Sequence, residues 1–498
     1  MNKYFYLLAF LCLYITAHAQ TTSLNVSESI EFKDKVKAGG ALAIHTTEDG
    51  KTGIIRQSKK NILFDVFDNE LNKTFSTQIE SNKKEVYKSN VTYKDEIKIF
   101  TLFSPKKKER IIYCHTFNIK TKKHSKKQLL SKTIDKKFPL FSGGMKRETS
   151  FSISPNGLYI AMATDDVKKN SNSYTIHVFD TETLELVYKK SYSRSENKFF
   201  EFNDLVVTDN ATAYSLGKLY KTGKSEKNKG DANYQFVIYK ISNDNVSSNL
   251  ISLENEHISS LNIIQNNEGL QLIGFYSEKN SGQIKGGCSF NLSQDNLNVI
   301  DKKSFELPQQ VFQDLYRDKK AKRKKKKGKE FSNFYTDYII EDAIGNTYLV
   351  AEEFFVTQTY VSNGMNGGGY WQTVYHYNDI LILKFNNTGE LDWGRSIFKN
   401  SNIPSYNVFL KDEKLHVILN SGKNLTEKKD GRTKVSKGWF ESSSLYDIVF
   451  NIDGEVKYDK IQDNKGKTYY LPYFGTYNDG TFIMMSDRRK RKQFMKLQ

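Results

Sequence analysis

The chain has 498 residues and a formal net charge of +18, from 75 Lys and Arg against 57 Asp and Glu. Aromatic residues make up 13% and only 6 residues are proline, which excludes wholesale disorder and a proline-rich linker protein. Three cysteines exclude a disulfide scaffold and a multi-cysteine zinc site. At about 150 residues per domain, the length predicts roughly three domains or one large repetitive domain.

The first predicted element is a secretory signal at residues 1–19. Lys3 supplies a positive charge, residues 4–15 form an apolar run, and Ala17-His18-Ala19 is a small-x-small cleavage site. The run is shorter than the roughly 20 residues of a membrane span; a short core strand is the alternative. The segment resembles Sec signals of the Bacteroidetes type. We expect cleavage after Ala19 and an exported protein, periplasmic or secreted, without a transmembrane segment in the mature chain.

Beyond the signal, strand-like runs alternate with tight polar turns. One stretch shows the unit plainly, because four strands are predicted at 151–154, 158–164, 174–179 and 184–192. Four antiparallel strands within about 45 residues correspond to one blade of a β-propeller.

Two sets of turns repeat this unit. Eight predicted turns between first and second strands lie at 48–50, 94–96, 155–157, 208–210, 266–269, 344–346, 411–413 and 478–480. Seven predicted turns between third and fourth strands lie at 68–70, 121–123, 181–183, 243–245, 294–296, 387–389 and 453–455. Asn, Asp and Gly dominate them because these residues tolerate positive φ or cap the local backbone. Eight blades are favoured and seven are the alternative, since terminal units are atypical.

Unassigned strand-like segments remain at both ends of the chain. Residues 23–32 precede the first unit, and 481–485 and 493–497 follow the last turn. Pairing an N-terminal strand with a C-terminal blade would close the ring and remove its open edges. The sequence therefore predicts an all-β fold, with residues 20–498 as a single β-propeller of four-stranded blades closed by N- and C-terminal strands. A β-sandwich or a solenoid is the alternative.

One unit also matches a known repeat in its residues. The segment FSISPNGLYIA at 151–161 resembles the SPDGxxIA segment of TolB-like and WD-repeat-like propellers, with Asn156 in place of the usual Asp. The resemblance covers one blade, while the other units match in rhythm only. It implies a propeller fold and brings no catalytic residue with it.

In a propeller, the loops between second and third strands open on the same face as the links between blades. Here these loops are long, at 165–173, 220–233, 362–370 and 421–442, whereas the other face has uniformly tight turns. Long loops on a rigid scaffold commonly carry function. We therefore expect the long-loop face to bind a partner.

A basic insertion at about 313–331 falls in the link between the fifth and sixth blades. Its core, residues 317–329, has ten basic residues and one acid, for a net charge of +9. Val311, Phe312, Leu315 and Tyr316 have helical spacing and predict a short helix before it. The candidate ligands are acidic polysaccharide and lipopolysaccharide, and a solvated, disordered loop is the alternative. The candidate contacts are Lys319, Lys320, Lys322, Arg323, Lys324, Lys325, Lys326 and Lys327.

A projecting hairpin is predicted at about 347–385, because its two strand-like runs exceed the usual five or six residues. Tyr370 and Trp371 lie beside its tip, and Trp439 and Phe440 lie in the corresponding loop of the next blade. Such aromatic side chains would stack on sugar rings or anchor a protein partner. Local packing on the rim is the alternative.

Motifs for chemistry are missing from the sequence. Residues 217–225 have the wrong spacing for a phosphate loop, and no nucleophile elbow, zinc helix or calcium loop occurs. Glu352 and Glu353 should point to opposite faces of a strand unless a bulge intervenes. Cys114 and Cys288 fall in blades two and five, too far apart to pair, so two free buried thiols are expected. No catalytic residue, metal ligand or cofactor is predicted.

These features predict an exported, non-enzymatic binding or scaffold propeller whose long-loop face binds an envelope protein or an anionic polymer. The alternative is a carbohydrate-active enzyme with its site at the central pore. A pair of carboxylates about 5–10 Å apart facing the pore would favour the enzyme. The sequence leaves the oligomeric state open.

Overall fold

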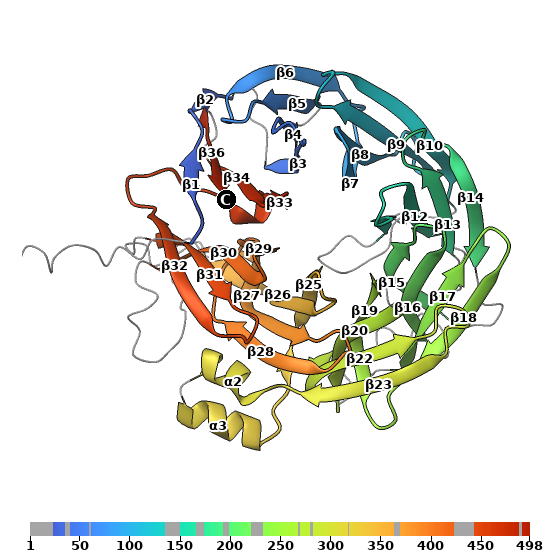
Figure 1. Cartoon of the computed structure of the whole chain (residues 1–498), viewed down its shortest axis with the longest axis vertical. Helices are drawn as coiled ribbons and strands as arrows, with labels where there is room; N and C mark the ends of the chain where they lie inside the picture. Colours follow the sequence, from blue (N-terminus) through green and yellow to red (C-terminus); the bar gives the residue numbers. More distant parts are fainter. Residues whose placement is uncertain are drawn as a thin grey trace, which may run out of the picture.

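The computed structural model describes residues 23–34, 40–58, 61–134, 150–165, 174–192, 199–220, 233–266, 269–278, 282–316, 318–362, 369–422, 443–487 and 491–498. These residues form eight four-stranded antiparallel sheets and two two-stranded sheets. The four-stranded sheets surround a central channel as the blades of a ring (Figure 1). The chain is therefore a β-propeller, and its four-stranded sheets match the favoured number of eight.

Blades one to four follow the order of the sequence, and each blade has its first strand innermost (Figure 1). Blades one and two contain β3 (Ala41–Thr46), β4 (Thr52–Gln57), β5 (Asn61–Phe67), β6 (Lys73–Glu80), β7 (Glu85–Tyr93), β8 (Glu96–Phe103), β9 (Glu109–Asn118) and β10 (His124–Thr133). Blades three and four contain β11 (Phe151–Ile153), β12 (Tyr159–Asp165), β13 (Tyr174–Asp180), β14 (Leu186–Tyr192), β15 (Phe199–Val207), β16 (Ala213–Tyr220), β17 (Tyr234–Ile241) and β18 (Val246–Ile251).

Blades five to seven continue the pattern around the ring. Blade five contains β19 (His257–Asn266), β20 (Gly269–Ser277), β22 (Gly286–Leu292) and β23 (Val299–Glu306). Blade six contains β25 (Phe334–Glu341), β26 (Thr347–Ser362), β27 (Gly369–Phe385) and β28 (Leu391–Ile397), and blade seven contains β29 (Tyr406–Lys411), β30 (Lys414–Gly422), β31 (Ser443–Phe450) and β32 (Val456–Asp463). Two helices, α2 (Gln309–Leu315) and α3 (Asp318–Lys326), and the short strands β21 (Gln283–Ile284) and β24 (Phe331–Ser332) accompany blades five and six.

Blade eight joins the two ends of the chain. The 3-10 turn η4 (Pro472–Phe474) leads into β33 (Thr476–Asn478), β34 (Thr481–Met485) and β36 (Phe494–Leu497), and β1 (Val26–Glu28) adds the outermost strand. Val26 of β1 pairs with Leu497 of β36, and β2 (Phe32–Lys33) pairs with β35 (Arg491–Lys492). The predicted closure by terminal strands is confirmed.

Burial differs between the strands of a blade, as the residue pattern requires. The third strand β5 is buried along nearly its whole length, because neighbouring blades cover both of its faces. The outermost strands β6 and β23 alternate half-buried and exposed residues, as expected for strands with one face in water. The core is therefore a series of apolar layers between adjacent blades.

Five of the eight innermost strands contain a β-bulge where they pair with the second strand. A bulge inserts one extra residue and turns side chains to new directions. In these strands the extra residues are Leu42, Lys88, Asn203, Ser259 and Asp337. The side chains facing the channel therefore do not follow from simple alternation along the sequence.

The two cysteines of the described residues behave as expected. Cys114 lies on the third strand of blade two and Cys288 on the third strand of blade five, and both are free and buried. Burial raises the pKa of Cys114 to about 12, and it also raises the pKa of Cys288. Both thiols therefore stay protonated at neutral pH and are poor nucleophiles.

A buried ion cluster links the closing segment to blade one. Arg56 of β4 contacts Asp34, just after β2, at 2.7 Å and Asp65 of β5 at 2.6 Å. All three side chains are about 1–2% exposed. Burial opposes the charge on Asp65, but the charges of Arg56 and Lys73 hold its pKa below the ordinary value. Arg56 and Asp65 are therefore ionised, and the contact of Arg56 with Asp34 fixes the segment after β2 against blade one.

We expect Arg56→Met to lower the free energy of unfolding by about 3–5 kcal/mol, because it leaves two buried carboxylates without their guanidinium partner. Chemical denaturation monitored by tryptophan fluorescence measures this loss. Lys51→Met is the control, since it removes an ion pair with Asp49 at the surface and should leave the midpoint nearly unchanged. Equal shifts in the two variants would contradict the role assigned to the buried cluster.

Candidate functional site

The basic insertion folds as two helices outside the ring, next to the outermost strand of blade six (Figure 1). Val311, Phe312 and Leu315 of α2 are buried, which confirms the helix predicted from their spacing. On the same helix, Asp314 accepts hydrogen bonds from the Arg395 side chain of β28 at 2.8 and 3.1 Å. An apolar face and an ion pair therefore fix α2 to the blade.

The basic run itself forms α3, so the alternative of a disordered loop is wrong for residues 318–326. Ala321 is fully buried in the cluster that contains Val311 and Phe312. The ammonium groups of Lys320 and Lys324 lie 4.8 and 4.2 Å from the centre of the Tyr316 ring. These contacts, which include cation–π interactions, hold one side of α3 against the protein.

Both ends of the insertion are attached to the same short segment of blade five. The Leu307 amide donates to the carbonyl of Lys285 at 3.1 Å, and Phe331 of β24 pairs with Ile284 of β21. Lys325 adds an ion pair with Glu306 at 2.6 Å. Backbone hydrogen bonds and an ion pair therefore hold both ends of the helical insertion against blade five.

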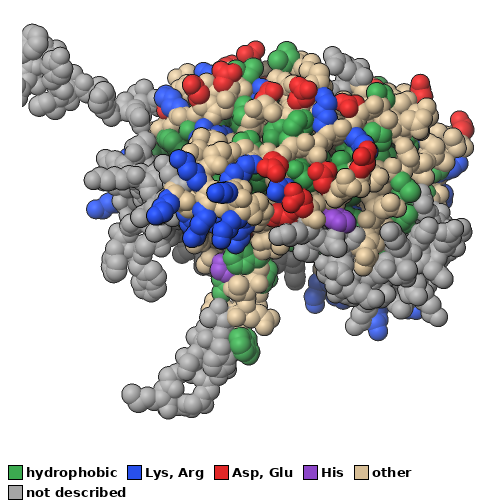
Figure 2. Space-filling model, turned by 90° about the horizontal axis from the view of Figure 1, so that it is seen from below, with side chains coloured by type: hydrophobic (Ala, Val, Ile, Leu, Met, Phe, Trp, Pro, Cys, Tyr) green, Lys and Arg blue, Asp and Glu red, His purple; other side chains and the backbone are tan. Residues whose placement is uncertain are grey.

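Most of the predicted basic contacts face solvent. Lys324 and Lys325 are half-buried, whereas the exposed basic side chains are Lys319, Lys320, Lys322, Arg323, Lys326 and Lys327. Lys and Arg side chains gather on this edge of the molecule, left of centre in Figure 2. Burial and the charges of Lys329, Lys320 and Arg323 lower the pKa of Lys324. The cluster is thus dense enough for its charges to repel one another, and a bound anion would relieve that repulsion.

The predicted hairpin is present, and its outer half stands beyond the blade. Residues 354–362 of β26 pair with 369–377 of β27, whereas the ladders to β25 and β28 end at Glu353 and Ile380. Trp371 is 66% exposed and Tyr375 is 50% exposed. In the register, Trp371 lies opposite Tyr360, and Tyr375 lies opposite Val356.

The other predicted aromatic contacts are only partly described. Tyr370 lies in β27 opposite Val361, but its side chain lies outside the described residues. Trp439 and Phe440 lie outside them entirely, as does the signal at 1–19. The structure therefore places Trp371 next to the hairpin tip and leaves the proposed pairing with the neighbouring loop as a prediction.

A bulge at Glu353 marks the base of the hairpin. The two adjacent carboxylates have different partners, as alternation along a strand requires: Glu352 contacts Lys399 at 2.5 Å with both side chains buried, while Glu353 acts on Asp379. Burial and the charge of Glu353 raise the pKa of Asp379 to about 7. Tyr316 also packs against the core cluster that contains Ala351 and Leu381, which adjoin the hairpin base. The hairpin base and the basic helix are therefore neighbours.

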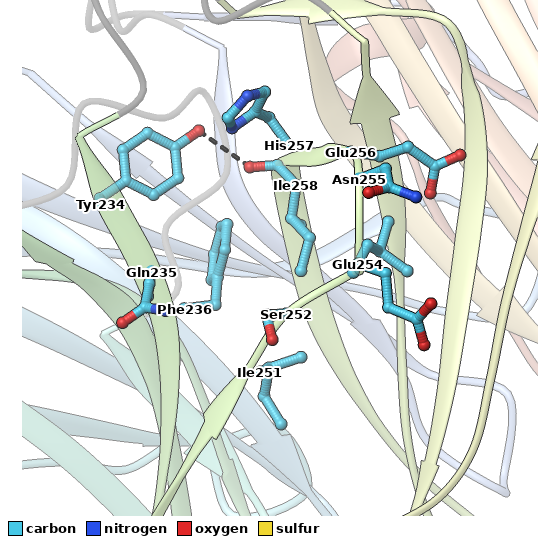
Figure 3. Close-up of a pocket in the computed structure, with 11 residues that line it drawn as sticks. Tyr234, Gln235, Phe236, Ile251, Ser252, Glu254, Asn255, Glu256, His257 and Ile258 are labelled. Atoms are coloured by element: carbon cyan, nitrogen blue, oxygen red, sulfur yellow. Dashed lines mark hydrogen bonds between the residues drawn. The ribbon is translucent and has the colours of Figure 1, made fainter.

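Two cavities lie elsewhere. One, of about 340 Å³, lies beside β17 and the link into β19, and Tyr234 donates a hydrogen bond across it to the carbonyl of Ile258 (Figure 3). Its carboxylates, Glu254 and Glu256, lie on the side away from Tyr234 (Figure 3). They bind Lys302 and Ser304 of β23. This cavity therefore does not gather reactive groups around one point.

The other cavity, of about 400 Å³, lies in the central channel. Its described lining contributes a single carboxylate, Asp337. The pair of carboxylates that glycoside hydrolysis commonly requires is therefore not present among the described lining residues. Within the described ranges, no group of three or more His, Cys, Asp or Glu side chains is arranged to hold a metal ion.

Comparisons with known proteins concern the fold. No protein-family model and no curated protein sequence matches the chain. Among solved structures, it is similar to the Dos1 propeller, with 6% identity over 94% of each chain and a TM-score of 0.45. It is also similar to the polysaccharide lyase Uly1, with 9% identity over 93% of this chain and 91% of that one and a TM-score of 0.41. The WD40 domain of SCAP from fission yeast has 8% identity, coverage of 95% and 94%, and a TM-score of 0.39.

Several residues at these sites carried no sequence signal. The sequence places Tyr316 only in a helical stripe, although its ring supports the basic helix. The sequence does not single out Asp337 or Asp379, because their positions depend on bulges in β25 and β27. A correct strand register would have been needed to find them.

Asp379→Asn should change the pH dependence of stability. Because the pKa of Asp379 is raised from 3.8 to about 7 in the folded protein, the folded state binds its proton more tightly than the unfolded state. Its contribution to stability is full below pH 3.8 and is lost as the pH rises through about 7. Asparagine does not titrate, and its amide oxygen can still accept from the Lys399 amide.

Denaturant unfolding at several pH values between about 4 and 8 measures this effect. The free energy of unfolding of the natural protein, taken relative to the variant, should fall as the pH rises. Parallel pH profiles would contradict the assignment to Asp379.

Proposed function

We propose that the protein is an exported, non-enzymatic binding protein whose outer edge at α3 binds an anionic polysaccharide. The observation that carries this proposal is the set of six exposed basic side chains on and beside a helix that is itself held by buried contacts. Export rests on the sequence pattern of residues 1–19. Across the described ranges, no helix is both long and apolar enough to span a bilayer.

Charge and order together favour a polyanion as the ligand. Each Lys or Arg can donate a charge-assisted hydrogen bond to a sulfate or carboxylate oxygen. Because α3 is already folded and anchored, a ligand does not have to order the chain on binding.

The hairpin favours a polysaccharide among polyanions. Tyr316 contacts Lys320 and Lys324 and packs against the core cluster that contains Ala351 and Leu381, next to the hairpin base. The exposed Trp371 ring projects from this neighbouring hairpin. An aromatic face suits the apolar face of a sugar ring, so charged helix and aromatic hairpin together suit an acidic sugar chain.

The basic edge is tested by replacing five exposed side chains with glutamine: Lys319, Lys322, Arg323, Lys326 and Lys327. None of them is buried, so α3 should stay folded. We expect elution from immobilised heparin at clearly lower salt, because fewer counterions are released on binding. The slope of log affinity against log salt should fall by about 0.7–0.9 for each lost contact.

A matched control removes five exposed lysines elsewhere, Lys83, Lys106, Lys107, Lys108 and Lys123. It carries the same net charge as the helix variant and should retain most of the heparin affinity. If both variants lose affinity equally, overall charge explains retention and the site at α3 is wrong.

The contribution of the hairpin is tested with Trp371→Ala. We expect weaker binding to heparin but unchanged binding to polyglutamate, which has no sugar rings. Ile300→Ala, at a position of β23 that is 72% exposed, is the control and should affect neither polymer. Unchanged heparin binding by Trp371→Ala, with polyglutamate bound as tightly as heparin, would instead point to an acidic protein surface.

A further inference from the structure

The cavity in the central channel has the size of a small-ligand site. Its volume is about 400 Å³, within the usual range of about 300–1,000 Å³ for ligand pockets. Its walls come from β3 and β7 on one side and from β25, β29 and the segment around η4 on the other. Blades distant in the sequence therefore meet around one space.

The bulge in β25 brings a carboxylate to this cavity. Thr336 pairs with Ala351 and Tyr338 pairs with Val350, so Asp337 is the extra residue between them. The Tyr406 hydroxyl donates to Asp337 Oδ2 at 2.7 Å. Burial and the charge of Asp337 raise the pKa of Tyr406 well above its ordinary value. Tyr406 therefore remains a donor and holds the carboxylate in a fixed orientation.

Aromatic rings form much of the remaining wall. The lining includes Tyr87, Tyr338, Tyr473 and Phe474. Burial raises the pKa of Tyr338 well above its ordinary value, and the charges of Asp337 and Tyr473 raise it further. Asn407 and Thr476 complete the polar part of the described lining.

The described lining contains no Lys, Arg or His, although the whole chain is strongly basic. Lys399 lies behind the wall, 5.5 Å from the centre of the Tyr406 ring. Its ammonium group forms an ion pair with Glu352 at 2.5 Å. Asp337 is the one charged side chain among the described lining residues.

We propose that this cavity binds an organic cation, an ammonium or guanidinium group held between the Asp337 carboxylate and the surrounding tyrosine rings. The carboxylate supplies a charge-assisted hydrogen bond, and the ring faces attract a cation. This site is separate from the basic edge at α3 and takes the opposite charge. The inference therefore stands whether or not α3 binds a polysaccharide.

Three probes test the proposal by calorimetric titration of the full chain. Agmatine is a small free cation, N-acetyl-arginine amide presents a guanidinium as a peptide side chain would, and N-acetyl-citrulline amide is its neutral counterpart. We expect at least one cationic probe to bind and the neutral probe not to bind. Agmatine alone would indicate a free small molecule, whereas N-acetyl-arginine amide would indicate a peptide. Equal binding of the citrulline probe, or no saturable binding of either cation, would overturn the proposal.

Asp337→Asn should weaken binding of the cationic probe by about ten- to a hundredfold, because a hydrogen bond to a charged group is lost. The amide oxygen of asparagine can still accept from Tyr406, so the fold should persist. Glu256→Gln, which removes a carboxylate from the other cavity, is the control and should bind normally. Unchanged affinity of Asp337→Asn would reject the assignment.

Tyr473→Leu provides a second test that leaves Asp337 and Tyr406 in place. It removes one ring of the wall and should weaken the cationic probe several-fold. The five-site glutamine variant of α3 should bind the probe like the natural protein, which separates this site from the basic edge. If Asp337→Asn does not fold, unchanged affinity of Tyr473→Leu would be the contradicting result.

Discussion

Closure of the ring is the constraint on which the structure depends. Blade eight exists only because β1, from the start of the described chain, adds to three strands from its end. The Arg56 cluster then ties the segment after β2 to blade one. Amide side chains continue such links on the inner side of the ring, as when Asn407 donates to the carbonyls of Pro472 and Gly475. Each blade therefore packs between two neighbouring blades, and the ring is closed.

That fixed ring separates two surfaces of opposite character. The outer edge at α3 carries the concentrated positive charge, and the channel cavity carries a carboxylate among aromatic rings. Because the described lining of the cavity has no basic side chain, the high net charge of the protein does not describe its interior. One scaffold can thus offer an anion-binding edge and a cation-binding channel, separated by the layers of a blade.

The strands and turns of the blades can be predicted from the sequence, but the side chains that line the channel cannot, for a physical reason. Turn positions such as 155–157 and 478–480 depend on local backbone preference, which Asn, Asp and Gly reveal directly. The helix α2 likewise followed from its apolar spacing. Asp337 is different, since a bulge places it in the cavity and its partner Tyr406 lies in the next blade. A bulge position and a contact between two blades cannot be recognised from a single sequence. The burial of Ala321 also could not be read from a run of lysines.

The attachment of the basic insertion has a consequence for how such a protein can vary. Its entry at Leu307 and its exit at Phe331 meet blade five at Lys285 and Ile284, two consecutive residues. The two helices therefore leave and rejoin the ring at practically one point. A segment with adjoining ends can be exchanged, lengthened or lost while the path of the ring stays the same. The propeller can therefore accept different segments at this position of its outer edge without a change in its blades.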